Sequence, residues 1–289
     1  MTERAPTPES LNLPPDWRIA VLTGAGISAE SGIPTYRGKD GLWTTGSRDY
    51  RPQDLATLRA FQAMPRDIWH WYFYRRCGCL KARPNAGHAA LADLARRLGP
   101  DRFTLVTQNV DGLHLRSGID PDAMIEIHGS LHRMRCTLPC GPEHFPLGDD
   151  QVLADRTEPL TDDAWSRLKC PRCGAMARPH VLWFDECYDE NLYRSETALD
   201  RVANAHLLLV VGTSGATTLP LMMVRTALRR NLAVIEVNPE ASAFTPAVRA
   251  HDRGVWLEEN ASTCLPRLAQ ALAPVAEKRP ATPSRAVRP

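Results

Sequence analysis

Residues 23–38 read Thr23-Gly24-Ala25-Gly26-Ile27-Ser28-Ala29-Glu30-Ser31-Gly32-Ile33-Pro34-Thr35-Tyr36-Arg37-Gly38, and this stretch decides the fold. It follows the apolar run 19–22, which is typical of a buried parallel strand. Glycines at this point let the backbone approach a diphosphate, and a helix behind them directs N–H groups at the anion. The turn predicts a phosphate site, although a tight strand-to-helix turn needs glycine for geometry alone.

The stretch departs from the pattern of an ordinary dinucleotide-binding dehydrogenase. Ala29 stands at the third glycine position, and the expected helix, strand and ribose-binding acid do not follow. Gly32, Pro34 and Gly38 interrupt the chain instead. We therefore expect a long loop that carries Arg37 and closes over a bound ligand.

Composition limits the classes of protein that fit. The 289 residues are 43% hydrophobic, enough for one main domain with an insertion. Against 35 Lys and Arg stand 33 Asp and Glu, so the balanced charge predicts no nucleic-acid partner. No apolar run approaches the roughly 20 residues that span a bilayer, and residues 1–16 lack a signal core, so we expect no membrane association and a cytoplasmic location.

Apolar strand-like runs alternate with helical patterns along the chain. The runs are 19–22, 103–106, 124–127, 181–184, 207–211, 233–237 and 255–257, and clear helical patterns are 86–98 and 219–230. This alternation predicts an α/β fold, a Rossmann-like parallel sheet with helices on both faces. We expect its ligand crevice at the carboxyl ends of the strands.

Two segments do not fit the alternation and predict a smaller domain built from two insertions. Residues 41–83 are rich in aromatic residues at helical spacing, and residues 131–178 hold four cysteines. The larger domain would then comprise 17–40, 84–130 and 179–275, and the proline-rich ends 1–16 and 276–289 are expected to be disordered tails.

Polar residues follow two of the predicted strands. Residues 107–114 read Thr-Gln-Asn-Val-Asp-Gly-Leu-His, and their short polar side chains suit a ribose or carboxamide, or equally a turn. His128 ends the next strand before a glycine, where a histidine can act as a general base near neutral pH or serve a structural role.

Two close cysteine pairs, Cys136 with Cys140 and Cys170 with Cys173, predict a metal site. Four thiolates complete a tetrahedral zinc shell with no open position, so the ion would be structural. Two further strand ends, 212–214 and 236–239, lie where the second half of a dinucleotide would bind, although either segment could be a helix N-cap.

Together these residues resemble the sirtuins, the NAD-dependent protein lysine deacylases. The resemblance runs from about 19 to 272 and rests on 24–38, 107–111, His128-Gly129, the four cysteines, 212–214 and 237–238. It implies His128 as the general base and Asn109 as a second catalytic residue. The implied NAD-binding residues are Gly24, Ala25, Gly26, Ile27, Ser28, Glu30, Ser31, Pro34, Tyr36, Arg37, Trp43, Gln108, Asn109, Val110, Asp111, Gly212, Thr213, Ser214, Asn238, Pro239 and Ala261.

The resemblance also implies the reaction. Acylated lysine on protein substrates would be deacylated while NAD+ is consumed, giving nicotinamide, O-acyl-ADP-ribose and free lysine, with one structural Zn²⁺ in the enzyme. The segment 181–186 looks like the strand that pairs with the substrate backbone, with Leu182, Phe184 and Glu186 as contacts. Alternatives are a mono-ADP-ribosyltransferase or NAD hydrolase on the same fold, or a non-enzymatic NAD-sensing scaffold.

Tyr72 and Arg75 match the Tyr-x-x-Arg pattern of the sirtuin branch that removes succinyl and malonyl groups. At this spacing both side chains share one helix face, where Arg75 can hold a carboxylate in a bidentate pair. A solvated arginine beside a packed tyrosine is the alternative. Tyr36, Asp185 and Gly215 depart from the family pattern, and Asp185 puts the peptide register in doubt.

Overall fold

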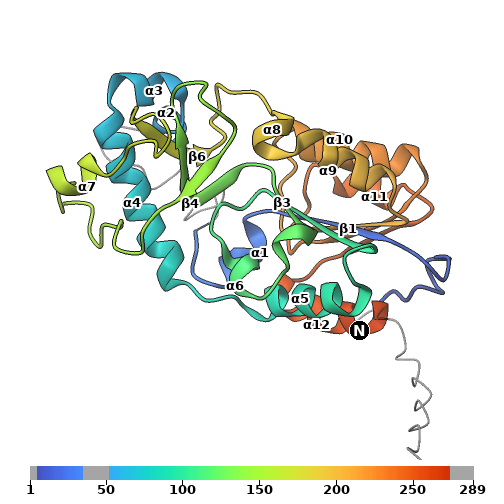
Figure 1. Ribbon diagram of the computed structural model, residues 1–289. Helices are drawn as coiled ribbons and strands as arrows, with labels where there is room; N and C mark the ends of the chain where they lie inside the picture. The colour runs from blue at the N-terminus through green and yellow to red at the C-terminus, as the bar shows by residue number, and fades with distance from the viewer. Residues whose placement is uncertain (1–4, 35–51, 274–289) are drawn as a thin grey trace, which may run out of the picture.

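The computed structural model describes residues 5–34 and 52–273, which form two units lying side by side (Figure 1). The larger unit contains a six-stranded sheet in the order β3-β2-β1-β7-β8-β9, and the smaller a three-stranded sheet in the order β5-β4-β6. The large-sheet strands are β1 (Ile19–Thr23), β2 (Phe103–Thr107), β3 (Met124–Glu126), β7 (Leu207–Val211), β8 (Ala233–Val237) and β9 (Gly254–Leu257). The small-sheet strands are β4 (Gly129–Cys136), β5 (His144–Pro146) and β6 (Ala177–Val181).

All pairings in the large sheet are parallel, as the apolar runs predict. Ile19 of β1 lies opposite Phe103 on one side and Leu207 on the other. The chain therefore reverses its strand order between β1 and β7, and the carboxyl ends of these two strands border the crevice where such sheets bind ligands.

Helices cover both faces of the large sheet, as expected (Figure 1). Alternate β1 residues point to opposite faces: Ile19 and Val21 join one core, and Ala20 and Leu22 the other. Helices α5 (Ala86–Leu98) and α12 (Ala261–Leu272) lie on the first face, and α9 (Ser195–Ala203), α10 (Thr218–Arg229) and α11 (Thr245–Arg249) on the second. Short helices fill the connections, namely α1 (Gly26–Ala29), α6 (Leu113–Arg116), the 3₁₀ turn η1 (Pro121–Ala123) and α8 (Glu190–Tyr193).

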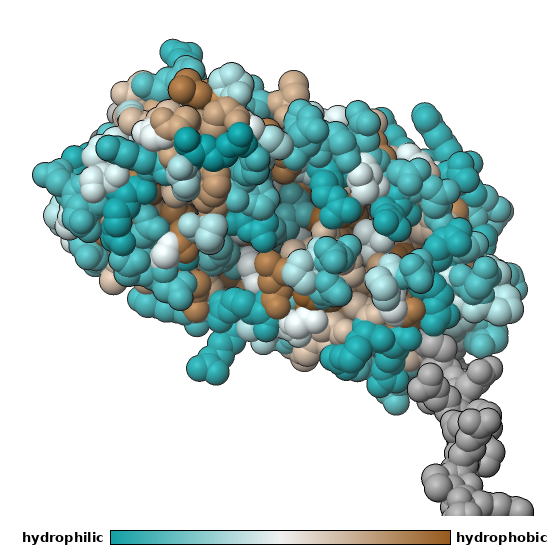
Figure 2. Space-filling model, in the orientation of Figure 1, coloured by the Kyte–Doolittle hydropathy of each residue, from teal (hydrophilic) through white to brown (hydrophobic). Residues whose placement is uncertain are grey.

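The smaller unit packs its sheet against helices. These are α2 (Pro52–Leu55), α3 (Leu58–Ala63), α4 (Pro65–Lys81) and α7 (Asp162–Ser166). Trp69 of α4 and Trp183 are almost fully buried in its core, and the indole of Trp69 donates to the Ala177 carbonyl of β6 at 3.0 Å. In Figure 2, apolar side chains on this face gather over α2 and α3, whereas hydrophilic ones cover α9 to α11.

Four boundaries expected from the sequence differ from the structure. Residues 5–16 are not a detached tail, because Leu11 is buried in the core and its carbonyl accepts a hydrogen bond from Arg253 at 2.6 Å. The expected domain limits at 130–131 and 178–179 fall inside β4 and β6, which continue the small sheet toward the large one. The strand expected at 181–184 is also wrong, because β6 ends at Val181. The expected tails at 1–4 and 276–289 lie outside the described residues.

Among the helices of residues 5–34 and 52–273, none combines the length and the apolarity that crossing a bilayer requires.

Candidate active site

The glycine turn after β1 touches the turn after β7. A Cβ on Gly24 would lie 2.7 Å from the Gly212 carbonyl oxygen, and one on Gly26 would lie 2.7 Å from the Gly212 Cα. Gly212 has a φ of +58°, which favours glycine. The contact of two backbones is thus a structural reason for these glycines. The expected helix behind them is only the single turn α1.

Gln108 and Asn109 join the carboxyl ends of neighbouring strands. The Gln108 side-chain amide donates to the Thr213 hydroxyl at 2.8 Å, and its carbonyl accepts from the Thr217 hydroxyl at 3.1 Å. The Asn109 amide donates to the Gly24 carbonyl at 3.0 Å. The ends of β1, β2 and β7 are therefore held together by side chains that the sequence predicted to lie in the crevice.

Ser28 is the centre of a buried polar network beneath this crevice. Its hydroxyl donates to the Asp111 carboxylate at 2.8 Å and accepts from the Asn109 amide at 3.2 Å. The other Asp111 oxygen accepts from the Leu113 backbone N–H at 2.8 Å, which is turn chemistry. The turn role expected for Asp111 is therefore confirmed, and its carboxylate also contacts Ser28 behind the glycine turn, whereas binding of a ribose or carboxamide stays a prediction.

His88 lies beside this network and was not singled out from the sequence. Burial lowers its pKa to about 4, although the neighbouring Asp111 opposes the shift. With Asn85 it forms a capping box at the start of α5, and the Asn85 amide donates to the Ile27 carbonyl at 2.8 Å. Asn before a helical pattern is a recognisable N-cap signal, so Asn85 could have been found.

His128 lies at the carboxyl end of β3 and directly before β4, where the chain passes from the large sheet to the small one. Its Nδ1 is 3.0 Å from the Gln108 carbonyl oxygen and its Nε2 is 2.9 Å from the Tyr188 hydroxyl. Burial lowers the pKa of His128 to about 4, opposed by the Gln108 carbonyl. The imidazole is therefore neutral near pH 7 and able to accept a proton.

Tyr188 is a contact of His128 that sequence reasoning missed. It lies between the segment 182–186 and α8, outside any regular element, so no periodic pattern marks it. Burial raises the pKa of Tyr188 to about 12, which keeps the phenol protonated.

Two of the residues expected to bind the cofactor, Glu30 and Ser31, also hold elements of the protein together. The Glu30 carboxylate accepts from the backbone N–H and the hydroxyl of Ser262, next to Ala261 at the start of α12. The Ser31 hydroxyl accepts from the Asn85 amide at 3.0 Å. Both contacts fix the chain that leaves the glycine turn.

The other predicted cofactor contacts differ in exposure. Ile27 is fully buried in the core, so its side chain faces away from the crevice. Ser214 and Pro239 are exposed, and the Asn238 amide donates to the Thr213 carbonyl at 3.4 Å. The turns after β7 and β8 are thus adjacent, as a site for the second half of a dinucleotide requires. Tyr36, Arg37 and Trp43 lie outside the described residues.

A cavity of about 280 Å³ separates the glycine turn from α4. One wall contains crevice residues predicted from the sequence, and the opposite wall contains three cations. The lining includes Ala25, Ser28, Pro34, Asn109, Val110, Asp111, Arg75, Lys81 and Arg156. A concave site with polar groups on one wall and cations on the other suits an anionic ligand.

Tyr72 and Arg75 share a face of α4, as their spacing predicts, but they do not play equal parts. Arg75 lines the cavity, and its guanidinium lies 4.7 Å from the Trp71 ring centroid. Tyr72 is buried, and its hydroxyl accepts the indole N–H of Trp183 at 2.7 Å. Of this pair, Arg75 is the side chain that reaches the cavity wall.

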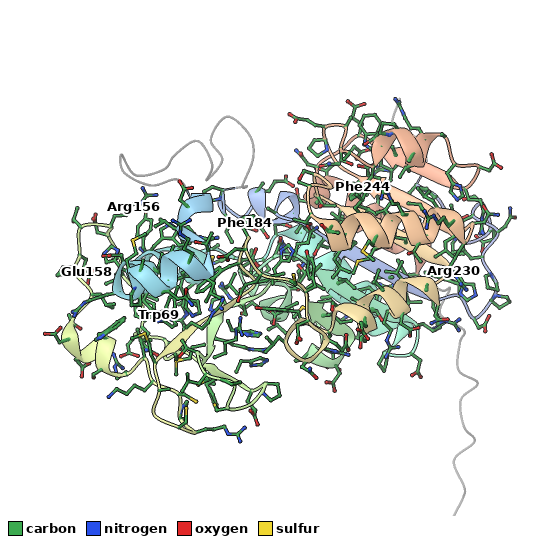
Figure 3. All side chains as sticks on the ribbon, turned by 90° about the horizontal axis from the view of Figure 1, so that it is seen from above. Trp69, Arg156, Glu158, Phe184, Arg230 and Phe244 are labelled. Carbon is green, nitrogen blue, oxygen red and sulfur yellow. The ribbon has the colours of Figure 1, made fainter. Side chains whose placement is uncertain are left out.

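The segment 182–186 is a turn rather than the expected strand. The backbone N–H of Leu182 donates to the His128 carbonyl at 3.0 Å, and that of Phe184 to the Ala56 carbonyl at 3.0 Å. Both backbone N–H groups already donate to carbonyls of the same chain. A substrate peptide would therefore have to pair with other backbone groups of this segment, or the turn would have to open. The Phe184 side chain is 57% exposed and lies between the two units in Figure 3.

Asp185 and Glu186 hold this turn in place. The Asp185 carboxylate accepts the backbone N–H groups of Leu58 at 2.7 Å and Arg59 at 3.1 Å, at the start of α3. The Glu186 carboxylate pairs with Arg178 at 2.5 Å. Burial raises the pKa of Glu186, but the Arg178 guanidinium outweighs this, and the pKa is lowered overall. The predicted substrate contact Glu186 is therefore engaged in the small unit.

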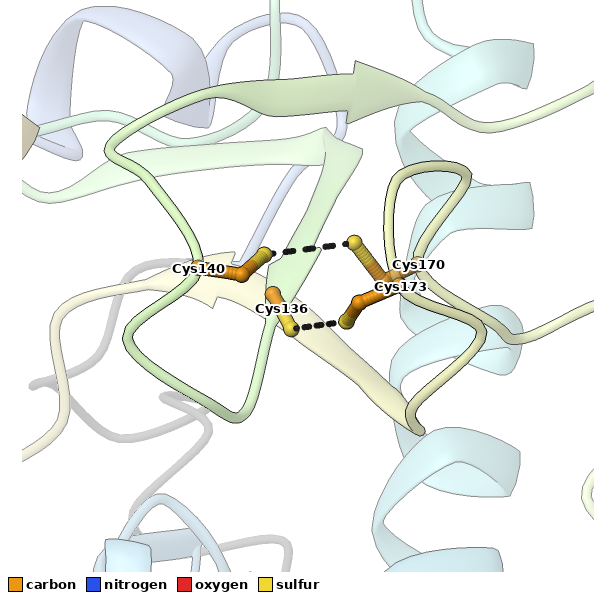
Figure 4. Close-up of side chains that lie close together, drawn as sticks. All are labelled: Cys136, Cys140, Cys170 and Cys173. Atoms are coloured by element: carbon orange, nitrogen blue, oxygen red, sulfur yellow. Dashed lines mark hydrogen bonds between the residues drawn. The ribbon is translucent and has the colours of Figure 1, made fainter.

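The four cysteines predicted to bind metal converge from the end of β4 with the loop that follows it and from the loop before β6 (Figure 4). Their sulfur atoms all lie within 4.8 Å of one another, with Cys136 and Cys173 3.5 Å apart and Cys140 and Cys170 3.6 Å apart. Sulfur atoms bound to one tetrahedral zinc ion at about 2.3 Å are about 3.8 Å apart. The donor set fits a structural Zn²⁺ that joins the end of β4 to the loop before β6.

The fold and the site define a doubly wound α/β protein of the dinucleotide-binding type, with a four-cysteine metal site in an inserted sheet. The chain belongs to the Sir2 family, whose model matches residues 24–218.

Relatives and solved structures agree with this assignment. The chain is 39% identical over 251 residues to the NAD-dependent protein deacylase of Leptospira interrogans, covering 87% of this chain and 91% of that protein. It is 40% identical over 250 residues to the NAD-dependent protein deacylase of Aquifex aeolicus, covering 86% and 93%. A crystal structure of a Sir2 homolog–NAD complex aligns with a TM-score of 0.70 and 35% identity over 88% of each chain. A Sir2 homologue mutant–ADP ribose complex aligns with a TM-score of 0.71 and 35% identity over 88% and 91%.

Proposed function

We propose that this chain is an NAD-dependent protein lysine deacylase that prefers acidic acyl groups. The observation that carries the deacylase assignment is the agreement between Sir2 membership and the site. Relatives named NAD-dependent protein deacylase cover nearly the whole described chain. The predicted base, amide and glycine turn lie at the carboxyl ends of adjoining strands.

NAD+, when bound, supplies the ribose that releases nicotinamide and receives the acyl group. Gly24, Gly26 and Gly212 bring two backbone turns together at the strand switch point, where a diphosphate can approach N–H groups. Asn109 holds the glycine turn against β2, and the Gln108 amide joins the Thr23 carbonyl at the end of β1 to the Thr213 hydroxyl after β7. These contacts organise the crevice before any ligand binds.

His128 acts as the general base at Nε2. The Gln108 carbonyl can only accept a hydrogen bond, so Nδ1 carries the proton and Nε2 has the free lone pair. A lowered pKa keeps that lone pair available at neutral pH. His128 would then take the proton from a ribose hydroxyl as the oxygen attacks the acyl carbon.

The preference for acidic acyl groups is supported by the cations of the cavity. Arg75 offers a planar pair of N–H donors that match a carboxylate, and its stacking on Trp71 restricts the guanidinium. Lys81 and Arg156 line the same cavity and add positive charge. A terminal carboxylate of a succinyl or malonyl group would exchange hydration for these contacts, whereas an acetyl group gains nothing from them.

The test compares acetyl-, malonyl- and succinyl-lysine peptides with the wild type, Arg75→Met and Arg66→Met. Arg66 lies on the same helix but pairs with Asp162 at the surface, so its loss controls for helix effects. Losing a hydrogen-bonded charge pair should lower kcat/KM on succinyl peptide roughly 10- to 100-fold and leave acetyl peptide within about threefold.

The products separate the deacylase from an ADP-ribosyltransferase or NAD hydrolase. One nicotinamide and one O-acyl-ADP-ribose should form for each lysine released. Free ADP-ribose without deacylation would overturn the deacylase proposal. Equal losses on acetyl and succinyl peptides in Arg75→Met would overturn only the acyl preference.

A further inference from the structure

The hydrogen-bond partners of His128 determine which of its two ring nitrogens carries the proton. The Gln108 carbonyl accepts from Nδ1–H at 3.0 Å, which leaves Nε2 of a neutral imidazole as an acceptor. The Tyr188 hydroxyl, 2.9 Å from Nε2, must therefore be the donor. The nitrogen that would act as the base is thus already occupied by a phenol of the same chain.

The phenol is itself held in place. The Tyr188 ring packs against the core formed by β7, β8 and α10, and the rings of Tyr188 and His128 have centroids 5.9 Å apart. The Thr217 side chain and the Leu219 backbone, at the start of α10, oppose the rise that burial causes in the pKa of the phenol. The hydroxyl is therefore directed at Nε2 by the large unit, while the Leu182 backbone N–H binds the His128 carbonyl from the other side.

We propose that Tyr188 is a positioning residue that keeps His128 in the Nδ1–H tautomer and occupies Nε2 until a ribose hydroxyl replaces the phenol. The proposal rests on His128 being the base of the proposed deacylase. It makes Tyr188 a competitor of the cofactor ribose for one lone pair. It also predicts that the phenol favours the neutral imidazole, because a donor to Nε2 stabilises only the unprotonated ring.

The test uses Tyr188→Phe, with Tyr193→Phe as the matched control. Tyr193 is another buried tyrosine, and its hydroxyl lies 3.5 Å from Arg135 rather than near His128. Removing a competing hydrogen bond should tighten binding of a non-hydrolysable carba analogue of NAD about two- to tenfold in Tyr188→Phe only. The acid limb of the kcat/KM profile should move up by about half to one pH unit in Tyr188→Phe and stay unmoved in Tyr193→Phe.

A second measurement needs no turnover. The ring ¹⁵N resonances of His128, assigned by their loss in His128→Asn, should report an Nε2 that accepts a hydrogen bond in the wild type. Adding the carba analogue should change the Nε2 resonance, and Tyr188→Phe should raise the pKa of the ring. If the deacylase proposal alone is wrong, these ring signals still respond to Tyr188→Phe.

Two results would overturn the proposal. The first is an Nε2 resonance and an acid limb that are the same in wild type and Tyr188→Phe. The second is a loss of kcat greater than about 30-fold with an unmoved acid limb, because this would make the phenol a required proton carrier rather than a group that is displaced.

Discussion

Replacing Ser28 by alanine tests whether the buried network beneath the crevice is a real source of stability. Ser28 is 1% exposed, and its hydroxyl is the donor to one Asp111 carboxylate oxygen. The hydroxyl is also one of two acceptors for the Asn109 amide. In the variant that amide would still donate to its other acceptor, the Gly24 carbonyl, at 3.0 Å. The substitution therefore removes the donor to Asp111, one of the two acceptors of the Asn109 amide, and the hydroxyl that lies 3.4 Å from the His88 Nε2.

The expected cost follows from these contacts. A buried carboxylate oxygen that loses its donor costs about 1.5–3 kcal/mol, whereas Asn109 retains an acceptor and adds little. We expect Ser28→Ala to lower the free energy of unfolding by about 2–3 kcal/mol. Ser31→Ala is the matched control. It removes one acceptor of the Asn85 amide, but that amide still donates to the Ile27 carbonyl at 2.8 Å. Its cost should stay below about 1 kcal/mol.

The assay is urea unfolding at pH 7.5, followed by circular dichroism and tryptophan fluorescence and extrapolated to zero denaturant. The dependence on urea should be unchanged, because neither variant alters the surface exposed on unfolding. A cost for Ser28→Ala within about 0.5 kcal/mol of that for Ser31→Ala would refute the reasoning.

Three further predictions follow from the contacts of the small unit and the buried histidines. Chelation of the metal should make the four cluster thiols reactive toward a thiol reagent and abolish deacylation. The control variant Cys187→Ser, which changes a cysteine outside the cluster, should behave like the wild type. Unchanged thiol reactivity after chelation would contradict the zinc assignment. Asp185→Ala should lower the free energy of unfolding by about 1 kcal/mol, because the Leu58 N–H at the start of α3 loses its acceptor. Asp185→Asn keeps an acceptor oxygen and should cost less. Equal costs of the two variants in urea unfolding would argue against this capping role. Burial lowers the pKa of His88 from 6.5 to about 4, so the unfolded chain binds a proton at this residue more readily than the folded protein does. The contribution of His88 to stability should therefore be full above pH 6.5 and fall by up to about 3 kcal/mol as the pH drops to 4. His88→Gln should make this loss of stability smaller but not abolish it, because burial lowers the pKa of His128 to about 4 as well, and an equally steep curve in the variant would count against the prediction.

Much of the fold was predictable because its signals are local. The run 207–211 is apolar throughout, as a strand buried on both faces must be, and it forms β7 over those same residues. The pattern 86–98 likewise forms α5. The errors lie where local patterns are weak: Leu11 is buried in a proline-rich segment that reads as a tail, and 181–184 is apolar but turns away from its sheet.

The candidate site was predictable to a smaller extent. Strand ends with polar residues identified Asn109 and His128, because the carboxyl ends of parallel strands meet at one edge. Glu30 and Glu186 show the limit of this reasoning. Their carboxylates bind Ser262 and Arg178, and nothing in the spacing of either glutamate shows which partner it will have.

The amino-acid sequence was enough to predict the parallel strands of the large sheet, the glycine turn and the two close cysteine pairs, because periodicity and spacing express contacts between near neighbours. Only the tertiary structure decided that Tyr188 meets His128 across 60 positions, and that Asp185 caps α3 across more than 100. Such contacts depend on how separate elements pack, and that packing decides which polar groups face the crevice and which hold the framework.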